Sequence, residues 1–237
     1  MRSENLKRLT HVSTNLTDPD YLVYKFLFRD LKAAISQWGR GAVLDIGCGN
    51  KPYEALFTGA VSYTGCDIVQ SSEKRVDVLC PSTEIPLLDA SYDTVFSTQV
   101  LEHVEDHGKM LAEAFRLLKA DGTLILSAPM MWPHHEVPYD FFRFTRYGIE
   151  YLFHKAGFTD VHIQQNGGKW ATIGQLRQTV WGQTVRKEKT IFRRLLFFFY
   201  KYCLKYVINI RYALLERLEP DDDFITLNFV VTARKPA

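Results

Sequence analysis

A short apolar run that ends in two closely spaced glycines constrains this chain more than any other segment. Residues 43–50 read Val-Leu-Asp-Ile-Gly-Cys-Gly-Asn, which suits a short buried strand with an acid, Asp45, inside it. Gly47, Cys48 and Gly49 form the turn, where glycine permits a positive φ and the close approach of another molecule. Doubly wound α/β proteins admit a nucleotide at such a turn, at the carboxyl edge of the sheet. The segment therefore predicts an α/β fold with a ligand site at this turn.

A second short strand closes on another acid. Residues 63–67 read Tyr-Thr-Gly-Cys-Asp, and an acid at this place accepts hydrogen bonds from ribose hydroxyls in nucleotide-binding folds. A G-x-G step alone occurs in many tight turns, so the pairing with Asp67 is what makes the signal specific. The nicotinamide dinucleotide fingerprint needs a third glycine, and the chain has Pro52 at that position. A nicotinamide cofactor is therefore disfavoured.

Three further segments follow in a recognisable order. Residues 85–104 read Ile-Pro-Leu-Leu-Asp-Ala-Ser-Tyr-Asp-Thr-Val-Phe-Ser-Thr-Gln-Val-Leu-Glu-His-Val, and Arg-Leu-Leu-Lys, Asp-Gly and Thr-Leu-Ile-Leu-Ser-Ala-Pro come after them, between 116 and 129. Together with the first two motifs, this order resembles the class I S-adenosylmethionine-dependent methyltransferases. Within them it resembles the branch of methyltransferase type 11 domains, which includes quinone and small-molecule methyltransferases. The likeness runs from about residue 43 to 158 and resumes in a final strand near 225–233.

The resemblance implies a Rossmann-like α/β fold: a seven-stranded mixed sheet with helices on both faces and an antiparallel last strand. The pattern of apolar residues agrees with alternating strands and helices, which implies a mainly parallel sheet. We expect strands near 42–46, 62–66, 76–79, 93–98, 123–128, 161–165 and 226–232, and helices near 52–57, 104–118 and 146–156. Before them, Asp18 and Pro19 predict the start of a helix that Gly39 ends.

The expected domain organisation has four parts. Residues 1–40 form an N-terminal helical cap, 41–166 the S-adenosylmethionine-binding core, and 224–237 the final strand that completes it. Residues 167–223 stand between strands six and seven as a helical insertion. Its segment 186–217 is basic and rich in aromatic residues, with nine Lys or Arg against two Glu. Three interpretations stay open for it: a lid over the substrate, a homodimer interface, or an interfacial helix on anionic lipid.

The resemblance also implies S-adenosyl-L-methionine as the cofactor and assigns its contacts. Asp45, Gly47, Cys48 and Gly49 match the first motif, and Asp67 matches the ribose acid. The side chains expected at the methionine end are those that follow strand four: Gln99, Val100 and Leu101. The chain departs from the family at the adenine contact, because Pro81 stands where an acid is common and has no side-chain acceptor.

The acceptor side is expected in residues 130–146, which follow strand five and therefore begin at the ligand-binding edge. His135 is the candidate general base, since histidine titrates near neutral pH. His134 is its rival, and Asp140 is a candidate to orient the ring. The alternative is that Asp140 and Arg143 brace the loop as an ion pair. No metal site is expected, because the adjacent histidines cannot easily both point to one ion. His103 is expected to shape the cofactor pocket.

Composition limits the partners and the compartment. A net charge of +2 argues against a general nucleic-acid binder. The four cysteines include no C-x-x-C pair, and the polar N-terminus does not look like a signal peptide. We expect a cytoplasmic protein with free thiols, in peripheral contact with a membrane if the segment 186–218 serves that purpose.

The predicted function is methyl transfer from S-adenosylmethionine to a small-molecule or glycan acceptor, with oxygen as the expected acceptor atom. The glycan class comes from residues 138–145, Pro-Tyr-Asp-Phe-Phe-Arg-Phe-Thr, which resemble a stretch found among methyltransferases of polysaccharide assembly. The alternative is a non-catalytic subunit that binds the cofactor or acts as a scaffold, for which the Pro81 departure and the long insertion are the reasons.

Overall fold

The structure is a computed structural model, and it describes residues 9–186, 190–220 and 223–237. It divides into two compact units. The sheet unit comprises Asp30–Gln164 and Phe229–Ala237 with the described part of Met1–Val12. The helical unit comprises Ser13–Arg29 and Gln165–Asn228. Each is described by itself.

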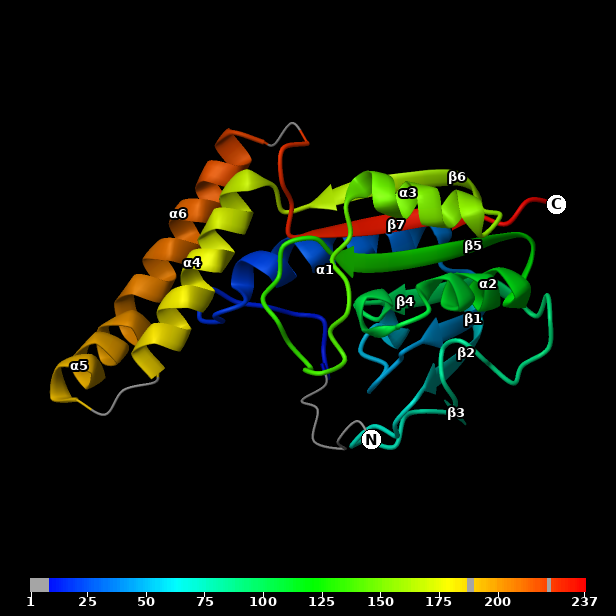
Figure 1. Ribbon diagram of the computed structural model, residues 1–237, viewed down its shortest axis with the longest axis horizontal. Helices are drawn as coiled ribbons and strands as arrows, with labels where there is room; N and C mark the ends of the chain where they lie inside the picture. The colour runs from blue at the N-terminus through cyan, green and yellow to red at the C-terminus, as the bar shows by residue number, and fades with distance from the viewer. Residues whose placement is uncertain (1–8, 187–189, 221–222) are drawn as a thin grey trace. The chain divides into compact units, whose positions relative to one another are not determined.

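The sheet has seven strands in the order β3-β2-β1-β4-β5-β7-β6 (Figure 1). The four central neighbours β2, β1, β4 and β5 pair in parallel, and β7 is antiparallel. The predicted seven-stranded mixed sheet is therefore confirmed. The strands are β1 (Arg40–Ile46), β2 (Gly59–Asp67), β3 (Val78–Leu79), β4 (Tyr92–Thr98), β5 (Leu118–Pro129), β6 (Thr159–Asn166) and β7 (Asn228–Arg234).

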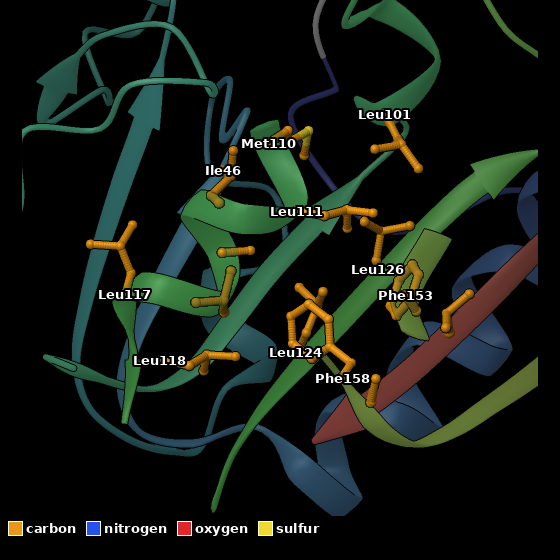
Figure 2. Packing of buried hydrophobic residues seen from close by; sticks show 14 of the residues in the cluster. Ile46, Leu101, Met110, Leu111, Leu117, Leu118, Leu124, Leu126, Phe153 and Phe158 are labelled. Atoms are coloured by element: carbon orange, nitrogen blue, oxygen red, sulfur yellow. The ribbon is translucent and has the colours of Figure 1, made fainter. Parts of the chain in front are cut away.

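Alternation along the central strands builds a core on each face of the sheet. Leu44 and Ile46 of β1 join the larger apolar cluster, whereas Val43 and Asp45, which alternate with them, are buried on the other face. Figure 2 shows this cluster, in which Leu124 and Leu126 of β5 lie among side chains from the helices. The strands are therefore covered on both faces, as parallel sheets require.

Two capped helices contribute to that cluster. Helix α2 (His107–Leu117) begins at Asp106, whose side chain accepts a hydrogen bond from the amide nitrogen of Lys109 at 3.0 Å. Helix α3 (Arg146–Lys155) begins at Thr145, which accepts from the amide nitrogen of Gly148 at 3.1 Å. Both caps satisfy amide groups that the first turn of a helix leaves without partners.

Several elements differ in extent from the sequence-based expectation. Helix α1 (Tyr21–Trp38) begins after the predicted Asp18–Pro19 start, and α2 begins later than residue 104 because Asp106 is its cap. The segment 52–57 forms only a 3-10 turn, η1 (Glu54–Leu56), and the third strand keeps two residues, Val78–Leu79. A second 3-10 turn, η2 (Leu101–His103), follows β4.

The helical unit contains the insertion. Its elements are α4 (Lys169–Arg186), α5 (Ile191–Phe199), a π-helical turn η3 (Tyr200–Leu204) and α6 (Lys205–Leu218). Helices α4 and α6 pack together through buried amides, where Nε2 of Gln178 donates to Oδ1 of Asn209 at 2.8 Å. Glu216 of α6 accepts from the amide nitrogens of Gly168 and Ala171 at the start of α4. These contacts make the unit a packed helical structure in its own right.

Among residues 9–186, 190–220 and 223–237, no helix is both long enough and apolar enough to cross a membrane.

Candidate active site

The turn after β1 has the backbone geometry that its glycines predict. Gly47 has φ of +76° and Gly49 has φ of +49°, both in the left-handed region. A Cβ atom on Gly47 would lie 2.3 Å from Cγ2 of Val100, so a side chain at this position has no room. The amide nitrogens of Gly47 and Cys48 both donate to the carbonyl oxygen of Cys66, at 2.8 and 3.1 Å. The turn is thereby fastened to the end of β2.

Asp67 connects the two predicted cofactor motifs. It ends β2, is 5% exposed, and its Oδ2 accepts a hydrogen bond from the amide nitrogen of Gly49 at 3.1 Å. Its Oδ1 accepts from the amide nitrogen of Val69 at 3.2 Å. A carboxylate at this place suits hydrogen bonds from a ribose diol. Beside this turn, Oδ1 of Asn50 is buried with no hydrogen-bond partner among the described residues. These features fit a nucleoside cofactor.

Asp45 faces the protein interior. The hydroxyl of Tyr63, on the neighbouring strand β2, donates to Oδ2 of Asp45 at 2.7 Å. Burial raises the pKa of Asp45 to about 7, although the bond from Tyr63 lowers it. Asp45 therefore links β1 to β2 just before the turn, and its direct contact with a cofactor stays a prediction.

The residues after β4 lie at the same edge of the sheet. Gln99 has φ of +54°, which is unusual for a residue with a side chain, and its Nε2 donates to Oγ of Ser127 at 3.1 Å. Val100 packs against Gly47, and Leu101 is fully buried in the apolar cluster. Of the three predicted contacts, Gln99 is the one with a polar side chain at the carboxyl ends of β4 and β5. Their roles remain predictions.

Residues 44–126 match the family model described as a methyltransferase domain. Over this segment the chain is similar to the class I S-adenosylmethionine-dependent methyltransferases. A probable S-adenosylmethionine-dependent methyltransferase of Mycobacterium tuberculosis is 36% identical over 96 residues, which are 37% of this chain and 35% of that protein. The chain thus spans about a third of the length of such curated relatives.

Solved structures agree with this methyltransferase fold. A Thermotoga maritima protein described as a possible histamine N-methyltransferase has a TM-score of 0.55 at 18% identity, covering 91% of this chain and 93% of that one. A second neighbour is phosphoethanolamine N-methyltransferase 2 of Haemonchus contortus in complex with S-adenosyl-L-methionine. Its TM-score is 0.52 at 19% identity, covering 88% of this chain and 53% of that chain. S-adenosylmethionine is the cofactor of this family.

Residues 130–146 form a loop braced by the ion pair between Asp140 and Arg143. Arg143 donates to both carboxylate oxygens of Asp140, at 2.7 and 2.8 Å, and to the carbonyl oxygens of Trp132 and Pro133. Burial alone would raise the pKa of Asp140, but the Arg143 guanidinium and the amide nitrogen of His135 hold it below its ordinary value. The predicted alternative, an Asp140–Arg143 brace, is present.

The two candidate histidines differ in their surroundings. The side chain of His134 is 92% exposed, whereas that of His135 is 30% exposed. Nδ1 of His135 lies 3.5 Å from Oδ2 of Asp140 and 3.3 Å from Nη2 of Arg143. The other ring nitrogen, Nε2, lies 4.0 Å from Oε1 of Glu102. His135 is thus the more enclosed of the pair, and its role as a base stays a prediction.

Glu102 is a site residue that sequence reasoning missed. Its side chain is fully buried, neither carboxylate oxygen has a hydrogen-bond partner among the described residues, and burial raises its pKa to about 8. Its carbonyl oxygen accepts from the amide nitrogens of Phe141 and Phe142, which fasten the acceptor loop to η2. Glu102, His103 and His135 offer ligand atoms within 4.8 Å of one another, a different grouping from His134, His135 and Asp140. The signal in the sequence was an acid directly before His103 in the turn after β4.

A small hollow elsewhere is not part of this site. It has a volume of about 110 Å³ and is lined by residues at the start of β5 and β6, including Thr123 and Asp160. Those residues lie at the opposite edge of the sheet from the β1 turn, because β1 and β5 run in the same direction through their common neighbour β4. We assign no function to it.

Proposed function

We propose that this protein transfers the methyl group of S-adenosylmethionine to a hydroxyl of a small-molecule or glycan acceptor. The observation that carries the proposal is the link between Gly49 and Asp67 at the carboxyl edge, on the same edge as the 130–146 loop. Bound S-adenosylmethionine supplies a methyl carbon on a sulfonium, and transfer to the acceptor oxygen breaks the carbon–sulfur bond and leaves a thioether.

The residues of the chain hold and orient the reactants. Asp67 accepts hydrogen bonds from the ribose, and the Gly47–Gly49 turn allows the cofactor to approach the backbone. Holding a nucleophile in line with the methyl carbon supplies on the order of 7–11 kcal/mol of the barrier. These roles are carried over from the family match, and each can be tested by substitution.

A hydroxyl acceptor must also lose its proton, and we assign this step to His135. The ring lies on the loop that follows β5, and Asp140 stands beside its Nδ1. Asp140 is then a positioning residue, itself held by Arg143. His134 is the alternative, but its greater exposure gives it fewer contacts to hold it in one orientation.

Nitrogen is the competing acceptor atom, since the names of the Thermotoga and Haemonchus proteins include N-methyltransferases. An acceptor screen that measures S-adenosylhomocysteine release decides between them. We expect turnover with hydroxyl acceptors such as phenols or sugars; turnover confined to amines would contradict the oxygen assignment. Tight cofactor binding with no turnover on any acceptor would favour the non-catalytic alternative.

For the insertion we propose a contact surface. Helix α5 and the turn η3 leave large apolar side chains more than half exposed beside Arg194 and Lys201: Ile191, Phe192, Leu195, Phe198, Phe199 and Tyr202. Amphipathic helices of this kind bind anionic lipid or a second copy of the chain. A lid remains the third interpretation. Cosedimentation with anionic vesicles, together with the molar mass in solution, separates the first two from the lid. Cytoplasmic location is part of the same proposal, supported by four free cysteines.

A further inference from the structure

Three potential metal ligands face one another between η2 and the acceptor loop. Nε2 of His103 lies 3.8 Å and Nε2 of His135 lies 4.0 Å from the same oxygen, Oε1 of Glu102. The two imidazole rings are 4.6 Å apart between centroids and meet edge to face. The carboxylate itself is fully buried, and both of its oxygens lack a hydrogen-bond partner among the described residues.

The buried Glu102 carboxylate needs a proton or a cation between it and the two imidazole rings. An isolated buried carboxylate is costly, so buried carboxylates are normally paired, protonated or bound to a metal. Arg143 is engaged elsewhere, with Asp140 and with backbone carbonyl oxygens of the loop. The candidates that remain are a proton and a cation.

The outer contact of the His103 ring resembles that of a metal-binding histidine. Nδ1 of His103 lies 2.7 Å from the carbonyl oxygen of Tyr139, which can only accept, so Nδ1 carries a proton, and in the neutral ring the lone pair is on Nε2. Nδ1 of His135 accepts from Nη2 of Arg143 at 3.3 Å and lies 3.5 Å from Oδ2 of Asp140, so an ion bound at Nε2 would require Nδ1 to carry the proton and donate it to Asp140 instead. Histidines that bind metals usually donate their second ring nitrogen to a carbonyl or a carboxylate.

We propose that Glu102, His103 and His135 bind one divalent transition-metal ion, with zinc as the preferred species. Two imidazole nitrogens and one carboxylate oxygen suit zinc and its first-row neighbours better than magnesium or calcium. Zinc lies about 2.0–2.2 Å from such ligands, which places them roughly 3.4 Å apart in a tetrahedron. The three side chains close toward one another by about 1 Å or less per group when the ion binds. Three protein ligands leave a fourth position open.

His135 belongs to the 130–146 loop, so an ion held by these residues would lie beside the predicted acceptor side. Resting on the proposed function, a bound ion would lower the pKa of an acceptor hydroxyl, as bound zinc does for water, and His135 would then serve as a ligand of the ion in place of a base. The binding of the ion itself does not depend on that function.

Metal retention is the measurement that tests the site. The full chain is stripped with a chelator, loaded with Zn²⁺ or Co²⁺, desalted and analysed for metal, without cofactor or acceptor. We expect about one ion per chain, a visible absorption band for the cobalt form, and no retention of Mg²⁺. Glu102→Gln, which keeps the shape of the side chain, should lose the ion. Asp140→Asn should weaken binding about 10–100-fold.

His162→Gln is the matched control, because His162 is an exposed residue of β6 at the opposite edge of the sheet. It should retain the ion as the unaltered chain does. If Glu102→Gln does not fold, His135→Gln replaces it, since His135 lies on a loop and is partly exposed. The proposal is overturned if the unaltered chain retains no metal, or if Glu102→Gln and His135→Gln retain as much metal as the unaltered chain. In either case a proton lies between the three groups. An active enzyme without metal retention would contradict the site alone, and metal retention without turnover would contradict the function alone.

Discussion

The amide nitrogen of Gly49 donates a hydrogen bond to Oδ2 of Asp67, so the glycine turn after β1 and the acid that ends β2 form one unit. The two residues come from separate sequence motifs, and the parallel pairing of β1 with β2 brings their carboxyl ends together. Neither motif alone is specific for a nucleotide. Their contact places a carboxylate beside the glycine turn, as the predicted nucleotide site requires.

Removal of the Asp67 charge should weaken cofactor binding more than it weakens the fold. Asp67→Asn keeps an oxygen that accepts from Gly49 and loses the charge that strengthens hydrogen bonds from the ribose. Hydrogen bonds to charged groups contribute about 1.5–3 kcal/mol, so affinity for S-adenosylmethionine should fall roughly 10–100-fold by calorimetry. Asp121→Asn is the control, because Asp121 forms an exposed ion pair with Arg234. Unchanged affinity in Asp67→Asn would remove Asp67 from the cofactor site.

An alanine at Gly47 should destabilise the protein. The new Cβ would meet Cγ2 of Val100 at 2.3 Å, and φ of +76° is strained for any side chain. Overpacking and an unfavourable φ each cost about 1–3 kcal/mol, which urea unfolding would measure as a lower midpoint. Adding Val100→Ala should recover the steric part and leave the backbone part. Gly108→Ala is the matched control, because its Cβ would have only one neighbour, at 3.5 Å, within a helix. Equal effects of the two alanines would show that the Gly47 turn is not crowded.

The Asp45–Tyr63 contact should give stability a measurable pH dependence. Burial raises the pKa of Asp45 from its ordinary value of 3.8 to about 7, so the folded protein holds a proton that the unfolded chain releases. The unfolded state binds fewer protons in this interval, so the contribution of Asp45 to stability falls as pH rises from 3.8 to about 7 and is then constant. The total change is on the order of 4 kcal/mol at most.

Asp45→Asn should flatten that slope, since an amide does not titrate. Tyr63→Phe removes the hydrogen bond that favours the carboxylate, so it should extend the fall in stability to higher pH. The free energy of unfolding between pH 5 and pH 8 is the measurement, and each variant is compared with the unaltered chain. A slope that Asp45→Asn leaves unchanged must come from another buried acid, of which Glu102 is the first candidate.

The strands and turns of this protein could be predicted from neighbouring residues, whereas contacts between residues far apart in the sequence could not. The octet at 43–50 predicted its strand and turn, because alternation and glycine act on the residues that carry them. The contact between Asp45 and Tyr63 depends on the register of β1 against β2, which places Tyr63 opposite Val43. Glu102 meets His135 only because the acceptor loop returns to η2 through two bonds to the Glu102 carbonyl oxygen. In the insertion, the buried Gln178–Asn209 pair was invisible in a pattern that showed charge and aromatic residues.

Substitution of His135 should lower turnover without a comparable effect on the cofactor. His135→Ala removes the group to which we assign loss of the acceptor proton, a step worth roughly 10²–10⁴-fold, while Gly49 and Asp67 remain in place. The loss should shrink as pH rises, because an acceptor that ionises by itself no longer needs the histidine. His134→Ala is the natural comparison, since its side chain is 92% exposed and adjacent in sequence. Steady-state rates of both variants across pH, with cofactor affinity measured in parallel, decide the assignment. A deficit confined to His134→Ala would move the role to that residue, and full activity in both would leave alignment of the reactants as the source of catalysis.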